Sequence, residues 1–128
     1  MCQEGVEMIN LEALQRLRQD TGTGFERVLA LFLKNIPIRL LTLEEAWRNQ
    51  DRLLLRQTAH KLKGTSATFC AEPFSQLCAQ LEKSADAASD PEIASLLEQI
   101  QQQGEQVKER LQRLLLQSLT GEQRSLHL

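Results

Sequence analysis

Apolar side chains recur at every third or fourth position along most of the chain, which is the spacing of helices that bury one face. The pattern predicts a short first helix after Asn10 and four longer helices that begin near Thr23, Asp51, Pro73 and Asp90. No segment alternates apolar and polar residues for long enough to indicate a β-strand. We therefore expect an all-α fold, an up-and-down antiparallel four-helix bundle with a short N-terminal covering helix.

Local residues indicate how two of the longer helices begin. Thr23, with Glu26 three residues later, fits a capping box and predicts the start of the second helix. Pro37 is expected to kink that helix, because its ring displaces one intrahelical hydrogen bond. Asn49 or Asp51 suits the N-cap of the third helix.

Length and composition describe a small helical protein. A chain of 128 residues fits one domain, with a core over about residues 10–118 and a frayed polar tail over residues 119–128. Since 41% of the residues are hydrophobic and only 4% are aromatic, the core must consist largely of leucine and alanine. That composition suits helices packed on helices.

Charge and hydropathy argue against several function classes. The formal net charge is −2 with acidic and basic residues nearly balanced, so we expect neither nucleic acid nor an anionic membrane as a partner. No apolar run reaches the roughly 20 residues that span a bilayer, and the first residues lack the pattern of a signal peptide. We therefore expect a cytoplasmic protein. The common motifs of nucleotide binding, zinc proteolysis and serine hydrolysis are absent, which weakens an enzyme interpretation without excluding one.

His60 is the residue with the most distinctive surroundings. On a helical wheel of about 100° per residue, it projects away from the expected core stripe of its helix. That stripe consists of Leu55, Ala59, Leu62, Ser66 and Phe69. The residues within about 60° of the imidazole are cationic, polar or very small, namely Arg56, Gln57, Lys63, Gly64 and Ala67.

A histidine among lysines is usually part of a solvated helix face, but that interpretation does not explain the glycine at position 64. Glycine in an exposed helix interior costs about 1 kcal/mol relative to alanine, and here it leaves open space beside the ring. Open space, a neutral imidazole and adjacent cations suit in-line attack of a histidine nitrogen on a phosphoryl group. Because the chain shows no nucleotide site, the donor would be a protein that already carries the phosphoryl group.

The segment AHKLKGTSATFCAEPFSQLCAQLE, residues 59–82, resembles the histidine-containing phosphotransfer (HPt) domain. This family of bundles relays phosphoryl groups between response-regulator receiver domains, and weaker agreement extends over roughly residues 10–115. The resemblance implies that His60 is phosphorylated on Nε2, that Lys63 helps to hold the phosphate and that Gly64 provides clearance for the receiver. Glu82 occupies the position of a polar residue, often glutamine, that orients the imidazole in the family. An ordinary surface glutamate is the equal alternative there.

The resemblance also implies the partners, which are response-regulator receiver domains and a hybrid sensor kinase. The chain would act as a phosphoryl carrier rather than an enzyme, with no cofactor of its own and with Mg²⁺ supplied by the receiver. Candidate partner-binding residues around His60 are Arg56, Gln57, Lys61 and Ala67. We expect a monomer, because one such bundle can function alone.

The three cysteines, Cys2, Cys70 and Cys78, show no CxxC spacing and are expected to be idle thiols. A metal site built from Cys70, Cys78 and His60 is a weak alternative, because the spacing fits no usual site. Cys70 also stands where the family usually has glycine. If that turn needs a left-handed backbone, the residue is strained by about 1 kcal/mol or the loop is rearranged.

Two other function classes remain open at this stage. A non-catalytic adaptor bundle would bind and sequester a receiver or kinase, although binding alone does not require a nucleophile. Autonomous phosphohistidine hydrolysis or kinase activity would require a nucleotide or water-activating constellation, and the sequence shows none.

Overall fold

The computed structural model describes residues 8–127, with side chains described as far as residue 117. Its elements in chain order are α1 (Leu11–Thr21), the 3-10 turn η2 (Gly22–Gly24), α2 (Phe25–Arg48), α3 (Arg52–Thr68), α4 (Glu72–Ser84) and α5 (Asp90–His127). Cys2 lies outside the described residues. The backbone of the expected tail is helical as far as His127, and the side chains of that tail lie outside the described part.

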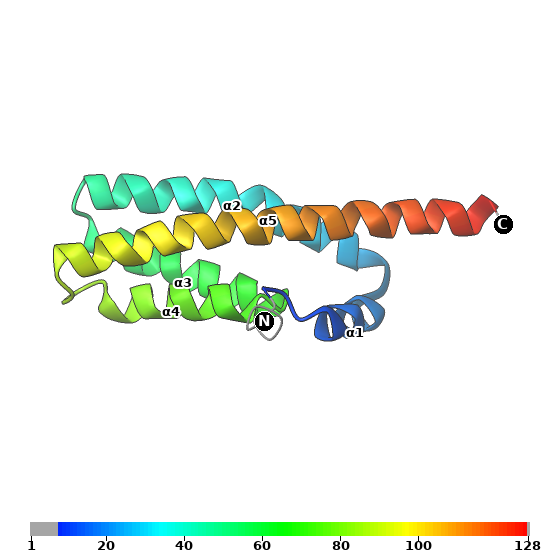
Figure 1. Ribbon diagram of the computed structural model, residues 1–128, viewed down its shortest axis with the longest axis horizontal. Helices are drawn as coiled ribbons and strands as arrows, with labels where there is room; N and C mark the ends of the chain where they lie inside the picture. Colours follow the sequence, from blue (N-terminus) through cyan, green and yellow to red (C-terminus); the bar gives the residue numbers. More distant parts are fainter. Residues whose placement is uncertain (1–7, 128) are drawn as a thin grey trace, which may run out of the picture.

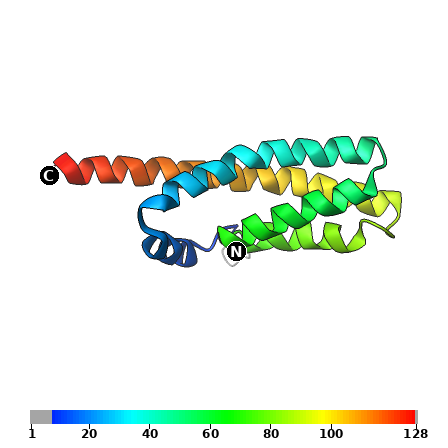
Figure 2. The ribbon, with the colours of Figure 1, turned by 180° about the vertical axis from the view of Figure 1, so that it is seen from behind.

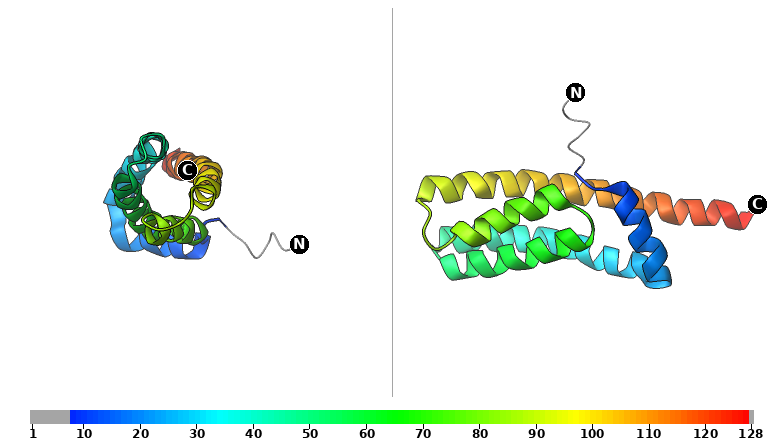
Figure 3. Two further views of the ribbon diagram at one scale, coloured as in Figure 1. Left: turned by 90° about the vertical axis from the view of Figure 1, so that its left-hand side faces the viewer. Right: turned by 90° about the horizontal axis from the view of Figure 1, so that it is seen from below.

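The helices α2, α3, α4 and α5 form a bundle around one core. Consecutive helices pack against each other, and α2 also packs against α5, which closes the ring seen down the long axis in Figure 3. Short turns join the helices, so neighbours in the sequence run antiparallel (Figure 1). The all-α, up-and-down four-helix prediction is confirmed.

Helix α1 covers the end of the bundle that α3 and α4 are too short to reach. These two helices have 17 and 13 residues, whereas α2 and α5 have 24 and 38. Figures 1 and 2 show α1 beside the parts of α2 and α5 that extend past α3 and α4. Leu14 of α1 is buried at this end, as are Phe25 and Leu29 of α2. The short covering helix is therefore present as predicted.

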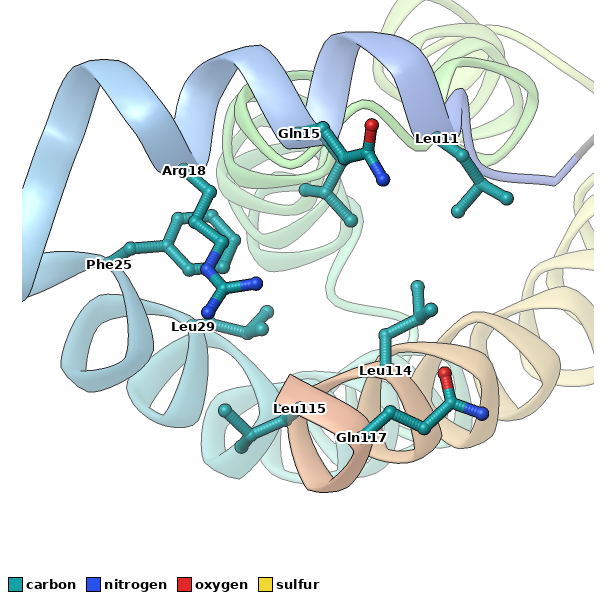
Figure 4. A pocket seen from close by; sticks show the side chains of 9 residues that line it. Leu11, Gln15, Arg18, Phe25, Leu29, Leu114, Leu115 and Gln117 are labelled. Atoms are coloured by element: carbon teal, nitrogen blue, oxygen red, sulfur yellow. The ribbon is translucent and has the colours of Figure 1, made fainter. Parts of the chain in front are cut away.

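This cover leaves a cavity of about 280 Å³ between α1, the start of α2 and the later part of α5. Figure 4 shows side chains from all three helices facing this space. The lining residues are Leu11, Leu14, Gln15, Arg18, Phe25, Leu29, Leu114, Leu115 and Gln117. None of them belongs to the surface depression that contains His60, so the cavity is a separate feature of the covered end.

The core is built from the predicted helical stripes. All five residues of the α3 stripe are buried, and Phe69 at its end stacks on Phe32 with ring centroids 5.0 Å apart. Val28 of α2 lies outside this core, with 49% of its surface exposed. Phe25 and Leu29 are both buried, and Val28, directly before Leu29 in the sequence, lies to the side of them on α2.

Helix starts follow local chemistry at Asn10 and Asp51 but not at Thr23. The Asn10 side chain accepts from the Ala13 N–H and caps α1. The Asp51 side chain accepts from the Leu54 N–H, so Asp51, one of the two predicted candidates, caps α3. The predicted capping box of Thr23 with Glu26 is wrong.

Helix α2 begins after Gly24, which offers no side-chain cap. The 3-10 turn Gly22–Gly24 runs directly into the helix, and the Phe25 N–H bonds to the Gly22 carbonyl. Thr23 therefore lies within that turn, and the Glu26 carboxylate lies 3.4 Å from Arg18 Nε. Helix α2 continues as one helix across Pro37.

Cys70 occupies a left-handed position at the turn between α3 and α4, with φ of 64°. Its N–H bonds to the Ala67 carbonyl at 3.0 Å, and the Ala71 N–H bonds to the Ser66 carbonyl at 2.9 Å. This pair of bonds is a Schellman ending, in which glycine is the usual residue. The Cys70 carbonyl accepts from the Asn10 N–H at 2.9 Å, which ties the start of α1 to this turn. The chain thus keeps the left-handed turn at a strained cysteine.

We expect Cys70→Gly to be about 1 kcal/mol more stable than Cys70→Ala, because only the alanine retains a Cβ at positive φ. Both variants lose the same thiol, so their difference isolates the backbone strain. Chemical denaturation followed by circular dichroism measures the two free energies of unfolding. Equal stabilities would contradict a strained turn.

Arg52 at the start of α3 holds the loop between α4 and α5. Its Nη1 donates to the carbonyls of Ala85 and Ala88 at 3.1 and 2.8 Å, and its Nη2 donates to Asp90 Oδ1 at 2.7 Å. The guanidinium carbon also lies 5.7 Å from the centroid of a Trp47 ring. One side chain therefore satisfies two carbonyls of the loop after α4 and binds the first residue of α5.

Arg52→Met is expected to lower the free energy of unfolding by about 2 kcal/mol, because hydrogen bonds from a charged donor are lost and two carbonyls lose their partner. Arg56→Met is the matched control, since the ion pair of Arg56 with Asp86 is long, at 3.9 Å, and exposed. That variant is expected to change stability by less than about 0.5 kcal/mol. Urea denaturation of both proteins measures the difference, and similar losses would refute the clamp.

Candidate functional site

His60 lies on the exposed face of α3, as the helical wheel predicts. The residues Ala59 and Leu62 on either side of it are fully buried, which fixes the rotation of the helix about its axis. The His60 side chain is 64% exposed and lies next to α4. An imidazole in this position is open to a large partner.

Glu82 of α4 contacts both His60 and Lys63. The Nδ1 atom of His60 lies 2.8 Å from Oε2 of Glu82, and Nζ of Lys63 lies 2.7 Å from Oε1 of the same carboxylate. Lys63 follows His60 by three residues, so their side chains share one face of α3. The carboxylate of Glu82 therefore joins these two side chains across the interface between α3 and α4.

Electrostatics assign the protons in this group. The hydrogen bond from Lys63, assisted by His60 and opposed by partial burial, holds the pKa of the Glu82 carboxyl below its ordinary value of 4.5. Glu82 is thus an ionised acceptor at neutral pH, so a neutral His60 ring carries its proton on Nδ1 and its lone pair on Nε2. Folding lowers the pKa of the Glu82 carboxyl, so its ionised form stabilises the folded protein. This contribution to the free energy of unfolding is complete above pH 4.5 and is lost as the pH falls through the lowered pKa.

The backbone around Gly64 provides space beside the ring. A Cβ built on Gly64 meets no atom within 4 Å, and both Gly64 and Ala67 are exposed. The hydroxyl groups nearby are already bonded, with Thr65 donating to the Lys61 carbonyl at 3.0 Å and Thr68 donating to the Gly64 carbonyl at 3.0 Å. On its C-terminal side, His60 is therefore followed by two exposed residues without bulky side chains, Gly64 and Ala67.

A hydrogen bond between α3 and α4 supports the site. Ser75 of α4 is buried and donates from Oγ to the Lys63 carbonyl at 2.9 Å. Sequence reasoning did not single out Ser75. This bond connects α4 to the turn of α3 that contains Lys63 and so helps to position Glu82 opposite His60.

The structure brings most of the predicted site residues together. A surface depression beside the imidazole is lined by Arg56, Gln57, His60, Lys61 and Glu82. Lys63 joins this group through Glu82, whereas Gly64 and Ala67 lie along α3 beyond the depression. Asp86, which sequence analysis did not select, lies 3.9 Å from Arg56 and places a negative charge beside that guanidinium.

The two described cysteines do not suit a metal centre. Cys78 is fully buried, and burial raises the pKa of its thiol to about 12. Cys70 is half-buried at the turn between α3 and α4, and burial also raises its pKa. Among the residues that the structure describes, no three His, Cys, Asp or Glu side chains are grouped so as to hold a metal ion.

The fold and this surface define a class of protein. A helical bundle that holds one imidazole nitrogen and exposes the other presents a nucleophile at its surface, where a partner protein can reach it. Comparison with known proteins identifies the class. The family model of the Hpt domain matches residues 27–122, so this chain belongs to the Hpt domain family.

A solved structure has the same fold. The crystal structure of histidine-containing phosphotransfer protein B (HptB) from Pseudomonas aeruginosa PAO1 superposes with a TM-score of 0.80 at 24% sequence identity. The match covers 86% of this chain and 96% of that one. The search of curated proteins found no matching relative.

Membership of this family establishes the general function. The protein is a histidine phosphotransfer protein of a two-component phosphorelay, and its partners are receiver domains. Domains of this family carry phosphoryl groups and are not kinases. None of the described helices combines the length and the apolar content that crossing a bilayer requires.

Proposed function

We propose that His60 accepts a phosphoryl group on Nε2 from the phospho-aspartate of one receiver domain and passes it to a second receiver. The Nε2 lone pair attacks phosphorus, a P–N bond forms and the P–O bond to the receiver aspartate breaks. The aspartate leaves as a carboxylate, and the proton on Nδ1 stays on the ring. Transfer onward reverses these steps on another aspartate.

The contact between Glu82 and Nδ1 is the single observation that most strongly supports this proposal. At 2.8 Å, an ionised carboxylate fixes the ring orientation and the tautomer, so the lone pair lies on Nε2 of a side chain that is 64% exposed. A histidine that only contacted a binding partner would not need its nitrogen lone pair directed outward.

The neighbouring residues have complementary roles in this proposal. Lys63 lies one turn beyond His60 and supplies positive charge for the phosphoryl oxygens. Gly64 and Ala67 let the receiver approach closely along α3. Arg56, Gln57 and Lys61 border the depression and contact the receiver surface around its aspartate, with Arg56 steering an acidic face toward the ring.

The receiver supplies the rest of the chemistry. Its acidic pocket would bring Mg²⁺, which neutralises charge on the transferring phosphoryl group, and this chain would need no cofactor of its own. We propose a hybrid sensor kinase as the first donor, because this chain shows no nucleotide motif. The protein then acts in the cytoplasm as a monomeric carrier and not as an independent enzyme.

A transfer assay tests this function. The protein is incubated with each of a panel of phosphorylated receiver domains and Mg²⁺, and separately with ATP alone. We expect at least one receiver to transfer an acid-labile label that mass spectrometry locates on His60, and ATP alone to give no label.

The other outcomes separate the alternatives. Binding to receivers without any labelling would favour an adaptor that sequesters its partner. Labelling by ATP alone would indicate a kinase, and label on another residue would refute the assignment of His60.

A further inference from the structure

The residue that holds Nδ1 of His60 carries a full negative charge. A neutral amide at this position would fix the ring equally well, because its oxygen accepts the same hydrogen bond. The Glu82 carboxylate contacts His60 through Oε2 at 2.8 Å and Lys63 through Oε1 at 2.7 Å. The carboxylate therefore brings to Nδ1 a charge that orientation of the ring alone does not require.

The charge matters most after phosphorylation. Attack by a ring that is protonated on Nδ1 gives a phosphoimidazolium, in which the ring is positive while the phosphoryl group is on Nε2. From this form the phosphoryl group departs and leaves a neutral imidazole. If the ring first loses the Nδ1 proton, the leaving group is an imidazolate anion, which is far less stable. The protonation state of Nδ1 therefore controls how readily the phosphoryl group is passed on.

We infer that Glu82 keeps phosphorylated His60 in the imidazolium form through neutral pH, which makes the phosphoryl group readily transferable and the phosphorylated protein short-lived. This inference rests on the proposed phosphorylation of His60. It assigns Glu82 as a positioning residue whose charge also sets the lifetime of the signal. The carboxylate is ionised throughout the relevant range, because Lys63 holds its pKa below 4.5.

Lys63 adjusts this effect. In the unphosphorylated protein its ammonium bonds to Glu82 and offsets part of the carboxylate charge. A phosphoryl group on Nε2 offers the same ammonium a second anionic partner on the same face of α3. As Lys63 shifts toward the phosphoryl oxygens, more of the Glu82 charge acts on the ring.

The other charges near His60 act more weakly. On α3 these are Arg56, 46% exposed, and Lys61, which is also exposed. The loop after α4 contributes Asp86, which pairs with Arg56 at 3.9 Å and is 69% exposed. Among the described residues, α2 contributes no side chain to the depression that contains the ring. Solvent screens such exposed charges strongly, so the directly bonded carboxylate dominates.

Comparison of the native protein with Glu82→Gln tests the inference. Each protein is phosphorylated with phosphoramidate, a small donor that needs no receiver, and the phosphohistidine ³¹P shift is followed between about pH 6 and 9, a range that spans ordinary histidine titration. Because glutamine keeps the hydrogen bond and removes only the charge, its titration midpoint is expected about one pH unit lower. The label on this variant should also survive several-fold longer near neutral pH.

A second variant, Lys63→Met, is expected to change the midpoint in the opposite direction. Removing the ammonium leaves the whole carboxylate charge to act on the ring, so the midpoint should rise above the native value. Circular dichroism shows whether each variant is folded. A Glu82→Gln midpoint and lifetime equal to the native values would overturn the inference while leaving the proposed function intact. Absence of any phosphohistidine at residue 60 in the native protein would instead refute the proposed function.

Discussion

Replacing His60 with glutamine is expected to lower phosphoryl labelling of the protein more than about 1,000-fold, while the bundle stays folded. An amide nitrogen is not a nucleophile toward phosphorus, because its lone pair is delocalised into the carbonyl. The side chain is 64% exposed, so the substitution leaves no cavity in the core. Glutamine can still donate a hydrogen bond to Glu82. The nearby hydroxyl groups of Thr65 and Thr68 are bonded to backbone carbonyls and do not substitute for the imidazole.

His127→Gln is the matched control. His127 is the second of the two histidines in the sequence and is the last residue of α5, far along the chain from His60. That variant should accept phosphoryl groups from a receiver at the native rate. Receiver binding is measured in parallel by titration calorimetry, and His60→Gln should retain it. Persistent acid-labile labelling of His60→Gln would show that another residue is the acceptor.

The bundle could be predicted from the sequence because burial alone determines the periodicity of its helices. On α3, every residue of the predicted stripe is buried, and His60 is exposed on the opposite side. A helix has a fixed angle per residue, so knowledge of one face determines the other. The rotation of the site helix therefore required no information from the rest of the fold.

Helix starts were harder to predict, because the same local signal occurs in places where it is not used. Thr23 with Glu26 fits the capping-box pattern but does not cap α2. Ser89 with Glu92 fits the same pattern, and there the Glu92 carboxylate accepts from the Ser89 N–H at 3.0 Å while Ser89 Oγ accepts from the Glu92 N–H at 3.4 Å. The path of the chain into the helix decides between the two, and that path depends on tertiary packing.

Contacts between helices are the part of the site that periodicity cannot provide. His60 and Glu82 are 22 residues apart, and their contact depends on how far α4 is displaced along α3. The resemblance to the family pointed to Glu82, but only the structure shows that its second oxygen binds Lys63. The Arg52 clamp spans 33 to 38 residues and has no signature in the sequence.

Replacing Gly64 with glutamine is expected to separate stability from function. A Cβ on Gly64 meets no atom within 4 Å, and glutamine is a good helix former, so the free energy of unfolding should rise by about 0.5–1 kcal/mol. Transfer from a receiver should nevertheless fall about 100-fold, because the new side chain occupies the space over which the receiver must approach His60. Denaturation curves and rapid-quench transfer rates measure the two effects.

Gly104→Ala is the contrasting control for this prediction. A Cβ on Gly104 would lie 3.0 and 3.1 Å from the two Cδ methyl groups of Leu40 and 3.3 Å from Cζ of Phe74, both of which are buried. Crowding in the core should cancel or outweigh the helix propensity that alanine gains, whereas transfer by the folded protein stays near the native rate.

Labelling of Gly64→Gln by phosphoramidate should be near native, since this small donor needs no clearance along α3. If Gly64→Gln instead exchanged phosphoryl groups with receivers at the native rate, the open space beside His60 would have no role in docking, and its glycine would be only a cost to the stability of α3.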